Sequence, residues 1–348
     1  MVPDLKLGTL WTVRNADVDI SYALIGVIAT VIVSAVNYVG IKTAAILQTI
    51  VTGMILASGL VLIFGASIQG ELSNATPLSA TPINGILIVL IMVPAMLVGF
   101  DVIPQSAEEI DVDPKKLGGL LSLSIALAVL WYILISISVG VALTSDQLES
   151  SEMATADAAN QLWANLSGGT WAGSLLVIGG IGGILTSWNA FIIGGSRVVF
   201  ALAESGKLPK YLGKIHPKYK TPHVAIATIG VISSLAPFFG ETILVWLINS
   251  GSFAVTVAFL FVAISFLILR KKEPEMPRPF KVKYGNLVGF GAVLMSLMLL
   301  SAFLPWSPSA LVWPAEWVTI FIWSLLGVIF LVYYEKKTAK TVTDEADK

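Results

Sequence analysis

The chain has 348 residues, of which 56% are hydrophobic and only 12% are charged, with a net charge of −1. Soluble domains carry about 25% charged residues, so the composition excludes a soluble globular domain and indicates a polytopic membrane protein. The chain has no cysteine, which excludes disulfides, thiolate metal sites and cysteine nucleophiles. Its first 20 residues are polar and mixed, so no cleavable signal peptide is expected.

Nine stretches are apolar and long enough to cross a membrane, because a spanning helix needs about 20 mainly apolar residues. They lie at about 20–39, 44–68, 83–108, 117–143, 171–203, 224–239, 242–269, 287–304 and 317–334. The first and second meet at 40–42 and the sixth and seventh at 240–241, where single glycines predict tight helical hairpins. The charged residues 335–348 are expected to form a disordered tail.

Lysine and arginine are distributed unevenly among the loops. Most of the 21 positive residues lie around 42, 115–116, 207–220, 270–283 and 336–348, and the alternate loops have none. By the positive-inside rule, the C-terminus is expected in the cytoplasm and, with nine spans, the N-terminus outside. Residues 1–19 would then cross the membrane without a signal. Either one span is miscounted, or an odd number of spans precedes Met1 in the complete fold.

The third apolar stretch contains residues that weaken a helix. Gly99 lowers helix propensity by about 1 kcal/mol relative to alanine, and Pro94 and Pro104 each free a backbone carbonyl. A kinked but continuous helix would also fit this spacing. Asp101 favours a break around 95–101, because an acid well inside a span usually faces a cavity and marks function. Freed carbonyls beside a carboxylate would suit an ammonium group or a cation.

Four segments resemble amino-acid permeases of the amino acid–polyamine–organocation (APC) superfamily. They are VNYVGIKTAAILQ (36–48), GFDVIPQSAEEI (99–110), SRVVFALAESGKLPKYLGKIHPKYKTP (196–222) and LRKKEPEMPRPFKV (269–282). The resemblance covers essentially the whole chain but begins late, because the first predicted span resembles the fourth of the family's twelve. It implies an all-α polytopic membrane protein with the LeuT-like inverted-repeat transporter fold, incomplete at the N-terminus by three helices.

The resemblance also implies a division of the single membrane domain, 1–348. Residues 20–68 would be the last two helices of the first repeat, 83–269 the complete second five-helix repeat, 287–334 two trailing helices and 335–348 a cytoplasmic tail. Three missing helices would also explain an external N-terminus. The family's first helix has a glycine-rich break that holds the substrate carboxylate, and no such stretch is found in this sequence.

The resemblance places a substrate site at the predicted break, where backbone carbonyls would hold the substrate's amino group. The matching positions are Ala95, Met96, Val98, Gly99, Phe100 and Asp101. Asp101 could carry a proton, pair with Arg197 or another helix, or accept hydrogen bonds from backbone amides of the break. Some proton-coupled relatives have a lysine in the fifth family helix, but Ile55 occupies its position here.

Several side chains near the break could act as gates. The candidates are Trp188, Phe191, Glu108, Glu109 and Arg197. An aromatic, one of the first two or Phe100, could close over the substrate, although helix packing also explains the first two. The charged residues could form an inner gate of ion pairs. They could equally be solvated interfacial charges, since exposed ion pairs contribute only about 0–1 kcal/mol.

The leading hypothesis is a secondary transporter that moves amino acids or related amines across the cell membrane by alternating access. An enzyme is not expected, because no histidine lies in a span and GGSR (194–197) has no base beside its serine. The alternative is a truncated or split-gene permease fragment without transport activity of its own.

Few partners are expected. They are an amino acid substrate, the lipid bilayer and, for a split permease, a separately encoded N-terminal segment; no nucleic acid is expected. His216 and His223 lie in a lysine-rich loop and make a poor metal site, so neither a metal nor another cofactor is expected.

Overall fold

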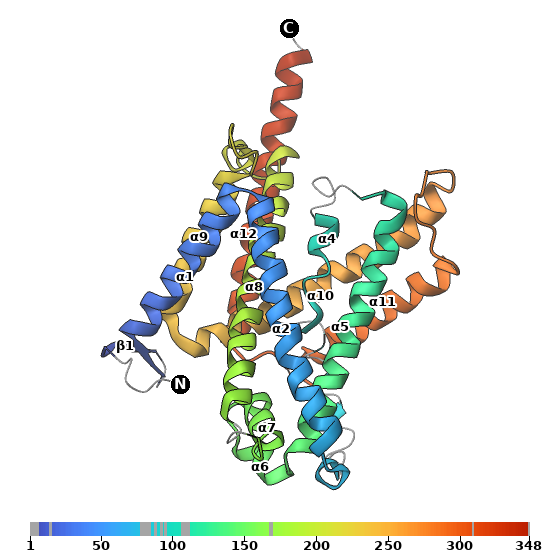
Figure 1. Ribbon diagram of the computed structural model, residues 1–348. Coiled ribbons are helices and arrows are strands. Elements are labelled where there is room, and N and C mark those ends of the chain that lie inside the picture. The colour runs from blue at the N-terminus through green and yellow to red at the C-terminus, as the bar shows by residue number, and fades with distance from the viewer. Residues whose placement is uncertain are drawn as a thin grey trace.

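The computed structural model describes residues 7–13, 16–76, 85–86, 89–90, 93, 96–105, 112–166, 170–307 and 310–346, and these are mostly helical (Figure 1). The long helices are α1 (Ile20–Val39), α2 (Ile41–Gln69), α5 (Pro114–Ala142), α8 (Thr170–Glu204), α10 (Gly240–Lys272), α11 (Gly285–Ala302) and α12 (Ala315–Ala346). The short ones are η2 (Leu72–Ala75), α4 (Val102–Gln105), α6 (Ser145–Ser150), α7 (Ala154–Leu162), η3 (Lys210–Gly213), α9 (His223–Leu235) and η4 (Ala236–Phe239).

Seven of the described helices are long and apolar enough to cross a membrane. They coincide with seven of the nine predicted stretches, so the predicted all-α polytopic membrane fold is confirmed. The sixth stretch is a shorter apolar helical segment, His223–Phe239. The third stretch, 83–108, is described only in part. The prediction of a disordered tail is wrong, because α12 continues as a helix to Ala346.

The two predicted glycine junctions are confirmed. Gly40 joins α1 to α2 with φ of 147°, and Gly240 joins η4 to α10 with φ of 73°. Residues other than glycine rarely adopt these backbone conformations. The positive φ therefore lets each pair of helices follow one another with almost no loop.

A hairpin of two strands precedes α1 and was not predicted. Strand β1 (Thr9–Val13) pairs antiparallel with β2 (Ala16–Asp19). The Trp11 indole N–H donates to the Phe238 carbonyl in η4 at 2.8 Å. Asp19 then caps α1 by accepting a hydrogen bond from the Ser21 backbone N–H at 2.9 Å. The hairpin therefore fixes the start of α1 against the junction of η4 and α10.

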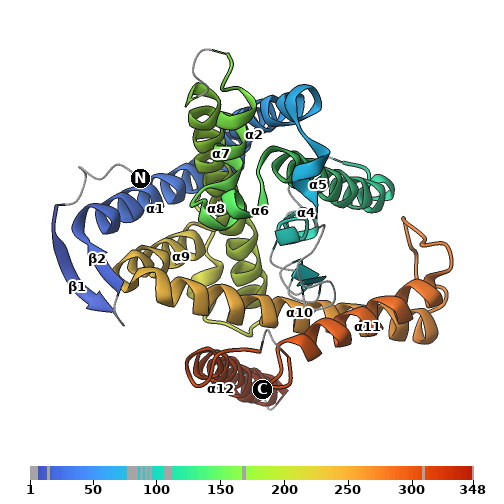
Figure 2. The same cartoon turned by 90° about the horizontal axis from the view of Figure 1, so that it is seen from below.

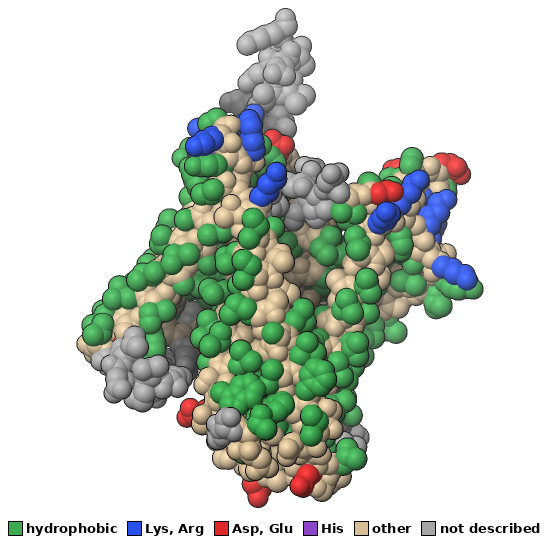
Figure 3. Space-filling view, viewed as in Figure 1, with side chains coloured by type: hydrophobic (Ala, Val, Ile, Leu, Met, Phe, Trp, Pro, Cys, Tyr) green, Lys and Arg blue, Asp and Glu red, His purple; other side chains and the backbone are tan. Residues whose placement is uncertain are grey.

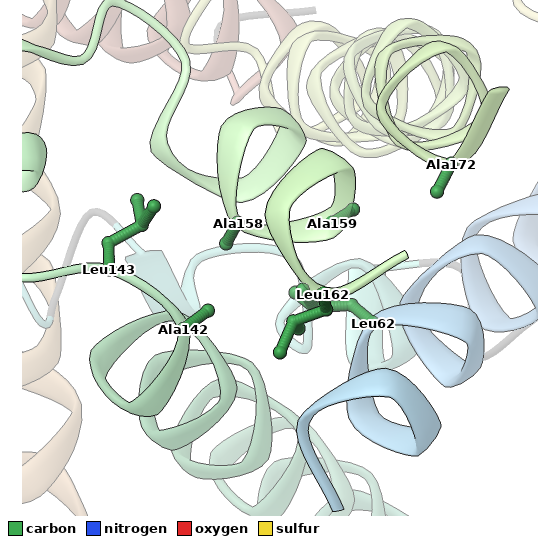
Figure 4. Packing of buried hydrophobic residues seen from close by; sticks show 7 residues of the cluster. All are labelled: Leu62, Ala142, Leu143, Ala158, Ala159, Leu162 and Ala172. Carbon is green, nitrogen blue, oxygen red and sulfur yellow. The ribbon is translucent and has the colours of Figure 1, made fainter. Parts of the chain in front are cut away.

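The larger of the two described clusters of buried apolar residues lies where α2, α5, α7 and α8 meet (Figure 4). Its buried residues are Leu62, Ala142, Leu143, Ala158, Ala159, Leu162 and Ala172. Four of the seven are alanines, and small residues let helices approach closely where lipid removes most of the hydrophobic driving force for packing. Segment 145–162 is thus folded against the bundle as α6 and α7.

Helices α2 and α8 pack tightly along their lengths, with glycine at the contacts. A Cβ on Gly179 would lie 2.1 Å from Ser58 Oγ, and one on Gly182 would lie 2.6 Å from Val51 Cγ1. Real Cβ atoms do not approach other atoms so closely. The two glycines therefore permit this separation of the helices.

A buried amide network joins α1, α2 and α8. The Asn37 amide donates to Asn189 Oδ1 at 2.7 Å, and the Asn189 amide donates to Gln48 Oε1 at 3.0 Å and to the Ala44 carbonyl at 3.3 Å. Asn189 is completely buried. In an apolar environment these partners are needed, because an unsatisfied buried amide is costly.

A buried acid connects α10 to α12. Glu316 is completely buried; its Oε1 accepts a hydrogen bond from the Asn249 amide at 2.7 Å and its Oε2 accepts one from the Val312 N–H at 2.6 Å. Ser250 also donates to the Glu316 carbonyl, at 3.2 Å. The carboxylate therefore fixes the start of α12 against α10.

Candidate substrate site at the turn before helix α4

The backbone before α4 is a turn at residues 98–101. Gly99 has φ of 129°, a backbone conformation that residues with a side chain rarely adopt. The Val102 N–H donates to the Gly99 carbonyl, and the Ile103 N–H to the Phe100 carbonyl, both at 3.2 Å. Each of these hydrogen bonds joins residues three apart, as in a 3-10 turn, whereas the hydrogen bonds of an α-helix join residues four apart. The local chain therefore changes direction where glycine and aspartate occur together.

Asp101 is part-buried and uses both carboxylate oxygens within this turn. Its Oδ1 accepts a hydrogen bond from the Gly99 N–H at 2.9 Å, and its Oδ2 accepts one from the Gln105 amide at 2.9 Å. Of the three predicted roles, the structure shows the acceptance of a backbone amide. The described contacts include no pair between Asp101 and Arg197. Proton carriage by Asp101 stays a prediction.

The turn lies between α5, α8 and α10 (Figures 1 and 2). The Tyr132 hydroxyl of α5 donates to the Met96 carbonyl at 2.9 Å, and the ring of Phe100 lies 5.7 Å from that of Phe259 in α10. Tyr132 is not among the site residues that the sequence predicts. The available signal was a hydroxyl among the apolar residues of 117–143, but the sequence does not show which backbone group that hydroxyl meets.

Helix α8 forms the third side of the candidate site. A Cβ on Gly194 would lie 2.1 Å from Gln105 Oε1 and 3.2 Å from Val102 Cγ2. Helix α4 therefore packs directly against the backbone of α8. Of the predicted substrate residues, Met96, Val98, Gly99, Phe100 and Asp101 are adjacent here, whereas Ala95 lies outside the described residues.

The candidate aromatic gates of α8 lie in different environments. Trp188 packs against the buried cluster of Val33, Ile192 and Ile226 from α1, α8 and α9, which is the helix-packing role. Phe191 is 52% exposed. Phe100 is the candidate aromatic that lies within the turn itself.

The charged gate candidates are described only in part. Arg197 is buried, with 7% of its surface exposed, and it donates to the Ile193 carbonyl at 3.2 Å and to Ser196 Oγ at 2.9 Å. Glu108 and Glu109 lie outside the described residues. The inner gate of ion pairs therefore stays a prediction. Among the residues that are described, no cluster of three or more His, Cys, Asp or Glu side chains could hold a metal ion.

Comparison with known proteins gives the family. The sequence profile of the family described as "Amino acid permease" matches residues 9–330. The branched-chain amino acid permease BcaP of Bacillus subtilis (strain 168) is 27% identical over 346 residues, which are 97% of this chain and 70% of BcaP. The methylthioribose transporter of the same organism is 25% identical over 338 residues, 97% of this chain and 68% of that protein.

A similarity over a shorter part of the chain extends to a mouse protein. Cationic amino acid transporter 4 of Mus musculus is 29% identical over 180 residues, 52% of this chain and 27% of that protein. These relatives are transporters, and the helical fold with seven candidate spans agrees with the LeuT-like class. The predicted resemblance to APC permeases is therefore confirmed, and with it the prediction that the chain is not an enzyme. Because the profile match extends over nearly its whole length, the chain belongs to the amino acid permease family.

Proposed function

We propose that this chain moves amino acids or related amines across the cell membrane by alternating access, and that the substrate's amino group binds at residues 95–101. Membership of the amino acid permease family supports the substrate class, as do relatives named for branched-chain and cationic amino acids. The observation that carries the site is the turn at 98–101, with its positive φ at Gly99.

The turn can bind an ammonium group through its carbonyls. Each carbonyl oxygen has two lone pairs. The carbonyls of Gly99 and Phe100 each accept one backbone hydrogen bond, and that of Met96 accepts one from Tyr132, which leaves capacity for a second donor. The Asp101 carboxylate lies in the same turn and adds negative potential. Three N–H donors of an ammonium match such a group of acceptors.

We place the C-terminus of this chain in the cytoplasm and the first residue outside. The supporting observation is the distribution of charge along the bundle. Figure 3 shows Lys and Arg side chains at the end that holds the α8–α9 and α10–α11 connections. Acidic side chains occur at both ends of this view, but near α6 and α7 they occur without Lys or Arg. By the positive-inside rule, the basic end faces the cytoplasm.

The predicted division into repeats is part of the same proposal: residues 20–68 belong to the first repeat and residues 83–269 form the second. So is an inner gate of Glu108, Glu109 and Arg197. Ile55 carries no charge, so we do not propose proton coupling through the position at which some proton-coupled relatives have a lysine.

The decisive experiment is uptake of radiolabelled amino acids by proteoliposomes that contain the purified full chain. We expect saturable uptake that excess unlabelled substrate inhibits. If the chain is inactive alone but becomes active with a separately encoded N-terminal segment, the split-permease alternative is supported instead. If neither preparation transports any amino acid or amine, the proposed function is wrong.

A matched pair of glycine variants tests the site. A Cβ on Gly99 or Gly119 would meet nothing within 4 Å, but only Gly99 has a positive φ. A non-glycine residue in such a sparsely populated conformation costs about 1–3 kcal/mol, so Gly99→Ala is expected to lower uptake about tenfold while Gly119→Ala leaves it unchanged. Equal uptake by both variants would show that transport does not need the turn.

A further inference from the structure

A groove at the basic end of the bundle lies between the end of α10 and the start of α11. It has a volume of about 410 Å³ and is lined by Leu267, Ile268, Arg270, Lys271, Asn286 and Phe290. The polar lining residues lie at the helix ends, and the apolar ones follow within about one helical turn along the spanning segments. The groove is therefore polar at the membrane boundary and apolar towards the membrane interior.

Arg270 is held in place at this groove by the α10–α11 connection. Its Nη2 donates to the Val282 carbonyl at 3.2 Å, and its guanidinium lies 4.7 Å from the centre of the Phe266 ring. Gly285 leaves room for it, because a Cβ there would lie 2.0 Å from Arg270 Cζ. Arg270 Nε is buried and has no hydrogen-bond partner among the described residues. The guanidinium is therefore held in one orientation beside the groove, and its charge favours an anionic acceptor there.

The start of α11 adds positive potential to the same groove. Its N-cap residue, Tyr284, has φ of 56° and gives no side-chain hydrogen bond to the first turn of this 18-residue helix. The free N–H groups and the helix dipole favour an anion at this end. Asn286, in the first turn, contributes an amide to the lining.

The acidic residues of the connection, Glu273 and Glu275, are exposed and do not line the groove. Arg278 donates to the carbonyls of Leu269, Glu273, Pro274 and Met276, so it caps the end of α10. Lys271 is exposed, and the described contacts include no ion pair for it. Lys and Arg side chains gather at this end of α10 and α11 in Figure 3.

We propose that this groove binds an anionic phospholipid, with its phosphate at Arg270, Lys271 and the first turn of α11. One acyl chain would lie along Ile268 and Phe290. The argument for a lipid over free phosphate is the apolar half of the groove, which opens on spanning helices; Phe290 is 66% exposed. Basic pockets between spanning helices at the cytoplasmic boundary are suited to anionic headgroups.

Native mass spectrometry of the purified full chain tests this proposal. The protein is titrated with phosphatidylglycerol or phosphatidylcholine, and bound lipids are counted at each concentration. We expect a preference for phosphatidylglycerol that falls about fivefold in Lys271→Gln, the effect of one basic residue near a membrane surface. Lys272→Gln removes the same charge from the adjacent residue, which does not line the groove, and is expected to keep the preference.

Two further measurements identify the source of the phosphate. Phe290→Ala, which keeps every charge, is expected to weaken phosphatidylglycerol binding, and excess inorganic phosphate is expected not to displace the lipid. Displacement by inorganic phosphate would assign the groove to a free anion and overturn the proposal. Equal losses in Lys271→Gln and Lys272→Gln would overturn it as well, because general attraction to the basic end would then explain binding. Binding without preference for phosphatidylglycerol over phosphatidylcholine would also overturn the proposal. None of these readings depends on transport.

Discussion

Asp101 gives the sharpest test of how the turn before α4 is maintained. Its carboxylate accepts one hydrogen bond from the Gly99 N–H and one from the Gln105 amide, each at 2.9 Å. Hydrogen bonds to a charged group contribute about 1.5–3 kcal/mol each, and the lower value applies because Asp101 is only part-buried. Asp101→Ala therefore destabilises the turn by roughly 3 kcal/mol, about a hundredfold in its equilibrium population.

Asp101→Asn separates hydrogen bonding from charge. The asparagine Oδ1 can still accept from the Gly99 N–H, and the Gln105 amide can rotate so that its oxygen accepts from the new Nδ2. Both contacts remain, without the charge. If Asp101 acts through these bonds, Asp101→Asn is expected to transport within about fivefold of the parent protein, a loss of about 1 kcal/mol.

Initial rates of amino acid uptake in proteoliposomes measure both variants, at equal amounts of protein that elutes as a single folded species. The expected order is parent, then Asp101→Asn, then Asp101→Ala, lower by up to about a hundredfold. If Asp101→Asn is as inactive as Asp101→Ala, the charge itself is required and the hydrogen-bond reasoning is refuted. If Asp101→Ala transports like the parent, the turn does not depend on this carboxylate.

Three further variants test contacts around the site and in the bundle. Tyr132→Phe removes the hydrogen bond to the Met96 carbonyl and is expected to cost about 1 kcal/mol, seen as weaker substrate protection in thermal unfolding. Asn189→Ala removes one hydrogen-bond partner from the buried Asn37 in α1 and one from the part-buried Gln48 in α2. It should lower the free energy of unfolding by about 1–3 kcal/mol, whereas Ser34→Ala, at a buried hydroxyl without a described partner, should not lower it. Gly179→Val overpacks the α2–α8 contact, while Gly180→Val projects into open space. Thermal melting is expected to show a loss of about 1–3 kcal/mol in the first alone, and equal melting of the two would contradict the proposed role of the glycine.

The sequence predicts this fold well where hydrophobicity determines it. Spanning helices were found from apolar length, and the junctions at Gly40 and Gly240 from the short gaps between them. The turn at Gly99 and Asp101 was expected because glycine, proline and an acid interrupt one apolar stretch. Each of these signals is local, so one sequence is enough to find it.

Contacts between distant residues could not be predicted in this way. Trp11 meets Phe238, and Tyr132 meets the carbonyl of Met96, only after the chain has folded. Glu316 lies one residue before the last predicted span, where an acid is ordinarily solvated, yet α10 buries it completely. Hydropathy records the cost of burying such a group but not the partner that offsets that cost.

The amide network and the glycine contacts described above have a mechanical consequence. Helices α2 and α8 have glycine at their contacts, and Asn189 also binds α1 and α2 through directional hydrogen bonds. Sliding α8 by one turn would break these bonds and bring side chains into the space that glycine leaves. In the proposed transport cycle, we therefore expect these three helices to move as one rigid body. The displacement would then occur at their borders, and the turn before α4 is such a border.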